Sequence, residues 1–312
     1  MMEHKSVLLH ETIDLLNVKP GGIYVDGTLG RGGHSKLLLS KLKNGHLYAF
    51  DKDEQALRES EAVLAGYRDM VTLIHGDFQT MREKLAEYGV EKADGIMMDL
   101  GVSSPQFDDP ERGFSYRYDA RLDMRMDRSQ TLDAYQIVNT YSFEDLCRIL
   151  WQYGEERNAK QIARAIERKR QTEPIVTTLQ LVDVIRSALP DKILSKKGHP
   201  AKQTFQALRI EVNHELASLS AGLEEAAEML SVGGRCAVIT FHSLEDRIVK
   251  DCFRKLSSAP FVEPKLPIKA SQMEQASFSL VTRKPVTAGD GELEENRRSH
   301  SAKLRVIERI KQ

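Results

Sequence analysis

The stretch GIYVDGTLGRGGHS, residues 22–35, decides the fold. A short apolar run ends in the acid Asp26, and four glycines then fall within seven positions: Gly27, Gly30, Gly32 and Gly33. A glycine-rich turn that joins a strand to a helix is typical of nucleotide-binding sheets, because glycine lets a ligand approach the backbone closely. We therefore predict a strand over 22–26, a helix over 35–42 and a cofactor at the turn between them.

Strands and helices continue to alternate from this turn to about residue 100. The periodicity predicts three further strands and two helices: strands over 46–51, 71–75 and 95–100, and helices over 54–65 and 79–88. Alternation of this kind builds a parallel sheet with helices on both faces. Ligands of such sheets bind beyond the carboxyl ends of the strands, so the residues that end each strand are candidates for the site.

The alternation stops after residue 100 and resumes late in the chain. There the pattern predicts a long helix over 205–230 and a strand over 235–241. We therefore predict an α/β fold with a Rossmann-like sheet interrupted by an inserted, mostly α-helical domain. The insertion takes residues 108–200, and the sheet domain takes residues 1–107 and 201–312.

Composition excludes several classes of protein. Hydrophobic residues make up 41% and charged residues 29%, which predicts a packed globular chain rather than a disordered one. No apolar run reaches the roughly 20 residues that a membrane span needs, and the N-terminus lacks a signal-peptide layout. The three cysteines are scattered without C-x-x-C spacing. We expect a cytoplasmic protein with no membrane contact and no metal site.

Positive charge gathers in two segments although the net charge is only −1. Residues 157–204 carry a net +7, and residues 296–312 carry a net +5. Within the first segment, Lys160, Arg164 and Arg168 recur at four-residue spacing on one predicted helix face. Charge alone fits either a polyanion-binding surface or an ordinary solvated helix face.

The residues around the turn favour one cofactor over another. Counted from Gly30, the dinucleotide fingerprint G-x-G-x-x-G fails, because Ser35 stands where its third glycine belongs. Asp26 would repel a pyrophosphate but suits a cationic amino-acid group. These features favour S-adenosylmethionine over a nicotinamide dinucleotide. Asp51 ends the second strand and is placed to accept hydrogen bonds from the ribose hydroxyls of either cofactor.

Two further strand ends carry chemistry. After the third strand, Asp77 and Phe78 are placed to bind and cover an adenine. After the fourth, the segment DLGVSSPQ offers acceptors to an exocyclic amine, namely Asp99, Ser103, Ser104 and the carbonyls before Pro105. Methylation of a pyrimidine at C5 requires a cysteine nucleophile, and this segment has none. The residues therefore favour methylation of an amine, in which an acid stabilises the positive charge that develops on nitrogen.

Several long motifs together resemble the bacterial 16S ribosomal RNA cytosine-N4 methyltransferase family, also called MraW or RsmH: VDGTLGRGGHS, FDKD, GDF, DLGVSSPQFD, RGFSYR, GHPAKQTFQALRIEVN, TFHSLEDRIVK and SAKLR. The resemblance covers nearly the whole chain. It implies a class I methyltransferase domain with an inserted helical domain, S-adenosylmethionine as donor, and a cytidine in the decoding (P-site) region as substrate. The donor-binding residues that it implies are Gly32, Gly33, His34, Asp51, Phe78, Asp99 and Gln106.

We expect Asp99 and Ser103 to act in catalysis. His242, at the end of the fifth parallel strand, is a candidate for contact with the base or for a purely structural hydrogen bond. Phosphate contacts are expected from basic residues of the insertion and the C-terminal segment: Lys160, Arg164, Arg168, Lys196, Lys197, Lys202, Arg297, Arg298 and Lys303. The expected partner is 16S ribosomal RNA in the small subunit or a late precursor, and a homodimer is left open. The alternatives are a nicotinamide-dependent oxidoreductase and a non-catalytic RNA-binding factor.

Overall fold

The computed structural model describes residues 6–259, 275–296 and 298–312, and the chain forms two compact units. The sheet unit comprises residues 1–101 and 216–312, and the helical unit comprises residues 102–215. The division therefore falls at different residues from those predicted. In the described part of the chain, no helix is both long enough and apolar enough to cross a membrane.

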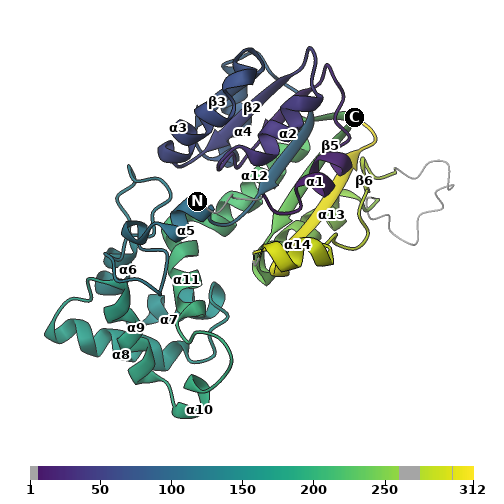
Figure 1. The fold of residues 1–312 in the computed structure, drawn as a ribbon. Coiled ribbons are helices and arrows are strands. Elements are labelled where there is room, and N and C mark those ends of the chain that lie inside the picture. Colours follow the sequence, from purple (N-terminus) through teal and green to yellow (C-terminus); the bar gives the residue numbers. More distant parts are fainter. Residues whose placement is uncertain (1–5, 260–274, 297) are drawn as a thin grey trace, which may run out of the picture. The chain divides into compact units, whose positions relative to one another are not determined.

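The sheet unit is built on seven strands in the order β3-β2-β1-β4-β5-β7-β6 (Figure 1). Strands β1 to β5 pair in parallel, and β7 pairs antiparallel with both β5 and β6. The order reverses between β1 and β4, so their carboxyl ends flank the crevice where such sheets bind ligands. The strands are β1 (Ile23–Asp26), β2 (His46–Asp51), β3 (Val71–His75), β4 (Ala93–Asp99), β5 (Leu230–Thr240), β6 (Phe278–Leu280) and β7 (Lys303–Arg309).

Helices cover both faces of the sheet (Figure 1), and each face has its own apolar core. One face packs against α1 (Leu9–Leu16), α2 (Gly33–Lys41), α3 (Glu54–Val63) and α14 (Asp290–Glu295). The other packs against α4 (Met81–Ala86), α12 (Glu215–Met229) and α13 (Ser243–Leu256). This doubly wound arrangement, interrupted by a helical unit, confirms the predicted α/β fold class.

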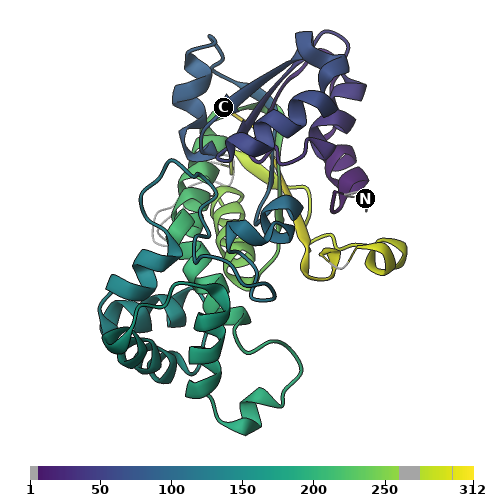
Figure 2. The same ribbon diagram turned by 60° about the vertical axis from the view of Figure 1, so that its left-hand side comes forward.

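The helices of the helical unit form one cluster (Figure 2), and they share a single apolar core. They are α5 (Ser104–Asp108), α6 (Ala134–Thr140), α7 (Phe143–Gln152), α8 (Ala159–Thr172), α9 (Thr178–Ala188), α10 (Asp191–Leu194) and α11 (Lys202–Asn213). The helix predicted over 205–230 is wrong as a single element. It breaks at His214, which adopts a left-handed conformation with φ 52°. Because Phe205 and Leu208 of α11 lie in the helical core, this helix belongs to the helical unit.

Candidate active site

The glycine-rich turn lies at the carboxyl end of β1. Gly30 and Gly32 have φ values of 52° and 72°, in the left-handed region that side chains with a Cβ avoid. The amide of Gly32 donates to the carbonyl of Leu29 at 2.8 Å, and α2 begins at the next residue. The predicted strand, turn and helix are thus in place, and glycine suits both left-handed positions because it has no Cβ.

Two carboxylates hold this turn from the inside. Asp26 is buried and accepts hydrogen bonds from the Thr28 amide at 3.0 Å and the Ser35 hydroxyl at 2.7 Å. Asp51 accepts from the amides of Gly30 at 2.8 Å and Asp53 at 2.9 Å. Burial raises the pKa of Asp26 and of Asp51 to about 6. The hydrogen bonds lower both pKa values, but their effect is smaller than that of burial. A carboxylate has about four acceptor sites, so Asp51 keeps capacity for the ribose hydroxyls.

Residues after β3 have partners within the chain. Asp77 lies 2.6 Å from Nζ of Lys52 and accepts from the Ser218 hydroxyl at 2.8 Å. Phe78 is only 8% exposed, and its ring lies against α12, where a Cβ built on Gly222 would fall 2.3 Å from Phe78 Cδ2. The structure therefore places this ring in the core. The adenine contacts expected of Asp77 and Phe78 stay predictions.

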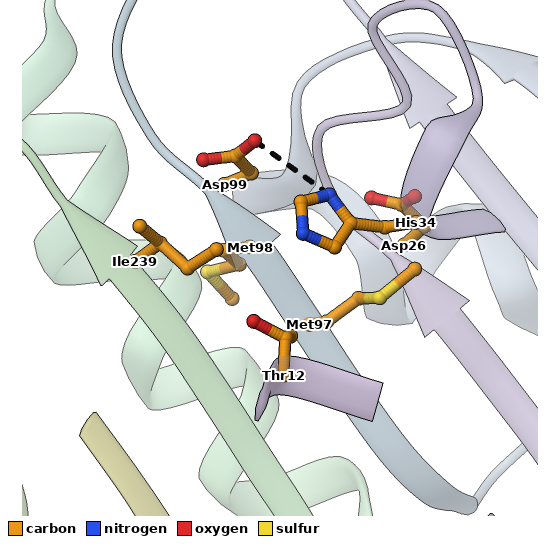
Figure 3. A pocket seen from close by; sticks show the side chains of 7 residues that line it. All are labelled: Thr12, Asp26, His34, Met97, Met98, Asp99 and Ile239. Carbon is orange, nitrogen blue, oxygen red and sulfur yellow. Dashed lines mark ion pairs between the residues drawn. The ribbon is translucent and has the colours of Figure 1, made fainter. Parts of the chain in front are cut away.

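A small pocket opens where β4 ends beside the turn (Figure 3). Its lining residues are Thr12, Asp26, His34, Met97, Met98, Asp99 and Ile239. Nδ1 of His34 lies 3.7 Å from Oδ2 of Asp99, and Nε2 of His34 lies 3.0 Å from the Val7 carbonyl. The amide of Asp99 donates to the Thr28 hydroxyl at 2.5 Å, which ties β4 to the turn.

Asp99 has the most perturbed carboxyl group of this site. Among the described residues, none gives a hydrogen bond to its buried Oδ1, although the side chain as a whole is 30% exposed. Burial raises the pKa of Asp99 to about 8, with the negative charges of Asp26 and Glu245 adding to the effect and Arg298 opposing it. A buried acceptor without a donor is unfavourable, so a ligand N–H at Oδ1 would be stabilised there.

Two contacts of the N-terminal segment could not be read from the sequence. A Cβ built on Gly33 would fall 2.0 Å from the hydroxyl oxygen of Ser6, so this glycine accommodates the N-terminal segment. Leu8, at φ 50°, donates its amide to Glu292 of α14 at 2.9 Å. Sequence periodicity carries no signal for such contacts, because the partners are far apart along the chain.

Ser103 and Gln106 belong to the helical unit, whereas the other residues predicted to act in catalysis or to bind the donor belong to the sheet unit. The Ser103 amide donates to the Gln106 side-chain oxygen at 3.0 Å, and the Gln106 amide lies 3.4 Å from the Ser103 hydroxyl. This reciprocal pair is a capping box at the start of α5. Both residues thus have a structural role of their own.

His242 also caps a helix. Its Nε2 lies 3.0 Å from Oε1 of Glu245, and its Nδ1 faces the Glu245 amide at 3.5 Å, at the start of α13. This arrangement supplies the structural role that the sequence left open.

Among the basic residues predicted to bind phosphate, six are exposed in the helical unit: Lys160, Arg164, Arg168, Lys196, Lys197 and Lys202. Lys303 lies 3.1 Å from Asp246, and Arg297 lies outside the described residues.

Comparison with known proteins places the chain in a family. A model of the MraW methylase family matches residues 1–310. Two relatives are each 53% identical to this chain over 312 residues. They come from Exiguobacterium sibiricum and Lactiplantibacillus plantarum, and both are named "Ribosomal RNA small subunit methyltransferase H". The first alignment covers 100% of both chains, and the second covers 99% of this chain and 98% of its relative. The chain therefore belongs to the MraW methylase family, a family of S-adenosylmethionine-dependent methyltransferases.

Proposed function

We propose that this chain methylates small-subunit ribosomal RNA at the exocyclic N4 amine of a cytidine in the decoding (P-site) region. Its relatives carry names that specify small-subunit ribosomal RNA as the substrate. The main support for N4 as the methylated atom is the buried Oδ1 of Asp99, at the end of β4. Among the described residues, no donor forms a hydrogen bond to this oxygen. An amine N–H is the kind of donor that this oxygen lacks.

The residues of the sheet unit fit the expected donor. The turn is open to close approach at Gly30, where a Cβ would meet no atom closer than 4.0 Å, and Asp51 has acceptor capacity left for two ribose hydroxyls. When bound, S-adenosylmethionine supplies an electrophilic methyl group on a positively charged sulfur. Carboxylates near this group are favourable, because they offset its charge.

Asp99 contributes in two steps to attack by the amine. The N4 lone pair is delocalised into the cytosine ring, so the amine is a poor nucleophile. A carboxylate that accepts an N–H hydrogen bond favours the pyramidal nitrogen and stabilises the positive charge that develops on it. With a pKa near 8, the same carboxylate is suited to take up the proton that the methylated amine releases.

The cysteines support an amine target. The C5 position of cytosine is methylated through a thiolate that attacks the ring. Burial raises the pKa of all three thiols, Cys147, Cys236 and Cys252, and so disfavours their thiolates. In the described part of the chain, no cysteine lines the pocket at Asp99. Asp99 is thus a better candidate than any thiol.

The helical unit is proposed to recognise the RNA, because residues 157–204 carry a net charge of +7.

The proposed function is tested with small subunits from cells that lack the gene. Purified protein and methyl-labelled S-adenosylmethionine are added, and the RNA is digested and mapped by mass spectrometry. We expect one N4-methylcytidine in the decoding region. RNA binding without any transferred label would instead support a non-catalytic binding factor.

A further inference from the structure

Trp151, the single tryptophan of the chain, lies near the end of α7 and is 63% exposed. So large an aromatic side chain is rarely left this accessible, which makes its ring a candidate contact surface. Phe143 and Cys147 precede Trp151 at four-residue spacing. The three side chains therefore follow one side of α7, because residues four apart on a helix are neighbours.

Basic side chains of α8 lie alongside this row. The guanidinium carbon of Arg164 is 5.8 Å from the centre of the Phe143 ring. Burial raises the pKa of the Cys147 thiol, whereas the charges of Lys160 and Arg164 lower it, so both cations lie near Cys147. The rows run in opposite directions, because Arg164 lies beside Phe143 at the start of α7, whereas Lys160, one turn earlier on α8, lies near Cys147, one turn later on α7. Lys160 is thus the basic residue of this row on the Trp151 side of Arg164.

The basic residues of α8 fall into two groups. Lys169 pairs with Glu173, and Arg170 donates to the carbonyls of Val138 and Tyr141, so these two are engaged within the chain. By contrast, Lys160, Arg164 and Arg168 are exposed, and within the described ranges none of them forms an ion pair. These three cations are available to a partner outside the chain.

We propose that this surface, formed by Phe143, Trp151, Lys160, Arg164 and Arg168, binds an unpaired segment of RNA. We call it the aromatic–basic face. Bases stack on Trp151 while phosphates lie along the cations, since aromatic rings beside positive charge are how proteins hold single strands. Glu144 and Glu167 also lie near Cys147 and offset part of the charge, so stacking contributes alongside the cations. The inference rests on the proposed function for its substrate.

Because the chain has one tryptophan, its fluorescence reports on this face alone. The full-length protein is titrated with an unstructured RNA of about 10 nucleotides, within the range that single-strand sites span. We expect quenching of Trp151 and protection from acrylamide. A duplex of the same sequence should bind without comparable quenching, because its bases are already stacked. Trp151→Ala should weaken binding about 10-fold, and Trp151→Phe should restore most of it.

The matched control is Tyr88→Ala, which removes an aromatic side chain that is 50% exposed in the sheet unit. It should leave RNA affinity unchanged. RNA that binds without quenching Trp151, or equal affinity of wild type and Trp151→Ala, would overturn the proposal. So would light scattering that shows a dimer in wild type and a monomer in Trp151→Ala, because the face would then join two copies of the chain.

Methyl transfer to small subunits is measured on the same samples, so that the two proposals can fail separately. If wild type transfers methyl groups but Trp151 is not quenched, only the aromatic–basic face is wrong. If Trp151 is quenched and its removal weakens binding while no methyl group is transferred, the face stands and the proposed function fails.

Discussion

Nδ1 of His34 lies 3.7 Å from Oδ2 of Asp99, while Nε2 of the same ring lies 3.0 Å from the Val7 carbonyl. A carbonyl oxygen only accepts hydrogen bonds, so Nε2 carries a proton. In the neutral ring, Nδ1 then presents its lone pair to Asp99. A protonated carboxyl is favourable opposite a lone pair, which agrees with the raised pKa of Asp99. Binding of a cation at this site should reverse that preference.

The pH dependence of donor binding follows from this pair. Below about pH 8 Asp99 is protonated in the free protein, and a positive sulfonium favours its carboxylate. Binding therefore releases a proton, so the affinity for S-adenosylmethionine should rise several-fold from pH 6 to 8 and then level off. Calorimetry in buffers of different ionisation enthalpy measures how many protons are released on binding. Asp99→Asn should flatten the profile. S-adenosylhomocysteine, which lacks the sulfonium charge, should show a shallower slope, and equal slopes for both ligands would count against this role.

Asp51 supports both the turn and the donor. Asp51→Ala removes the acceptor of the Gly30 and Asp53 amides and the proposed acceptor of the ribose hydroxyls. We expect a loss of about 1–3 kcal/mol in the free energy of unfolding. Donor affinity should fall by roughly 2–4 kcal/mol. Denaturant unfolding and calorimetry measure the two separately. A destabilised variant with an unchanged dissociation constant would leave Asp51 with a structural role only.

The close packing of Phe78 against Gly222 predicts that a larger residue at position 222 clashes with the Phe78 ring. Gly222→Ala places a Cβ 2.3 Å from Phe78 Cδ2, and Gly27 packs closely against the Cβ of the same side chain. We expect destabilisation of about 1–3 kcal/mol despite the better helix propensity of alanine. Phe78→Leu should relieve much of it in the double mutant. Gly291→Ala in α14 is the matched control, because nothing lies within 4 Å of its added Cβ. If both alanine variants are as stable as wild type, the ring is not packed as described.

The basic row on α8 predicts a change in salt dependence. Reversing the charges of Lys160, Arg164 and Arg168 should weaken binding to ribosomal RNA and reduce its salt slope by up to about 3, while donor affinity is kept. The control reverses three exposed cations of the sheet unit: Lys43, Arg68 and Lys255. Filter binding over a range of salt concentrations measures both sets. The same slope for the α8 variant and wild type would make this an ordinary solvated helix face.

The sheet and its turn could be predicted from the sequence because their signals are local. Glycine spacing marks the turn, and Asp26, Asp51 and Asp99 meet because parallel strands end at one edge of the sheet. Contacts between distant residues could not be predicted. Periodicity does not tell whether the ring of Phe78 faces a ligand or the core, and its partner Gly222 lies on a helix far along the chain.

Some differences between the predicted and the observed structure had a signal in the sequence. The S-x-x-Q spacing of Ser103 and Gln106 is that of a capping box, so a helix start was a sufficient reason for these residues. The break at His214 had a weaker signal, because the apolar pattern runs through it without proline or glycine. Which unit α11 joins depends on contacts with α7 that form only in the folded chain.

The central claim is attack by the N4 amine without a covalent bond between enzyme and RNA. The most direct measurement uses a small subunit or fragment with 5-fluorocytidine at the target position, followed by denaturing electrophoresis and nucleoside mass analysis. We predict that the RNA is released carrying an N4-methyl group, with no protein attached. A stable protein–RNA adduct that disappears when Cys147, Cys236 or Cys252 is replaced would contradict the account.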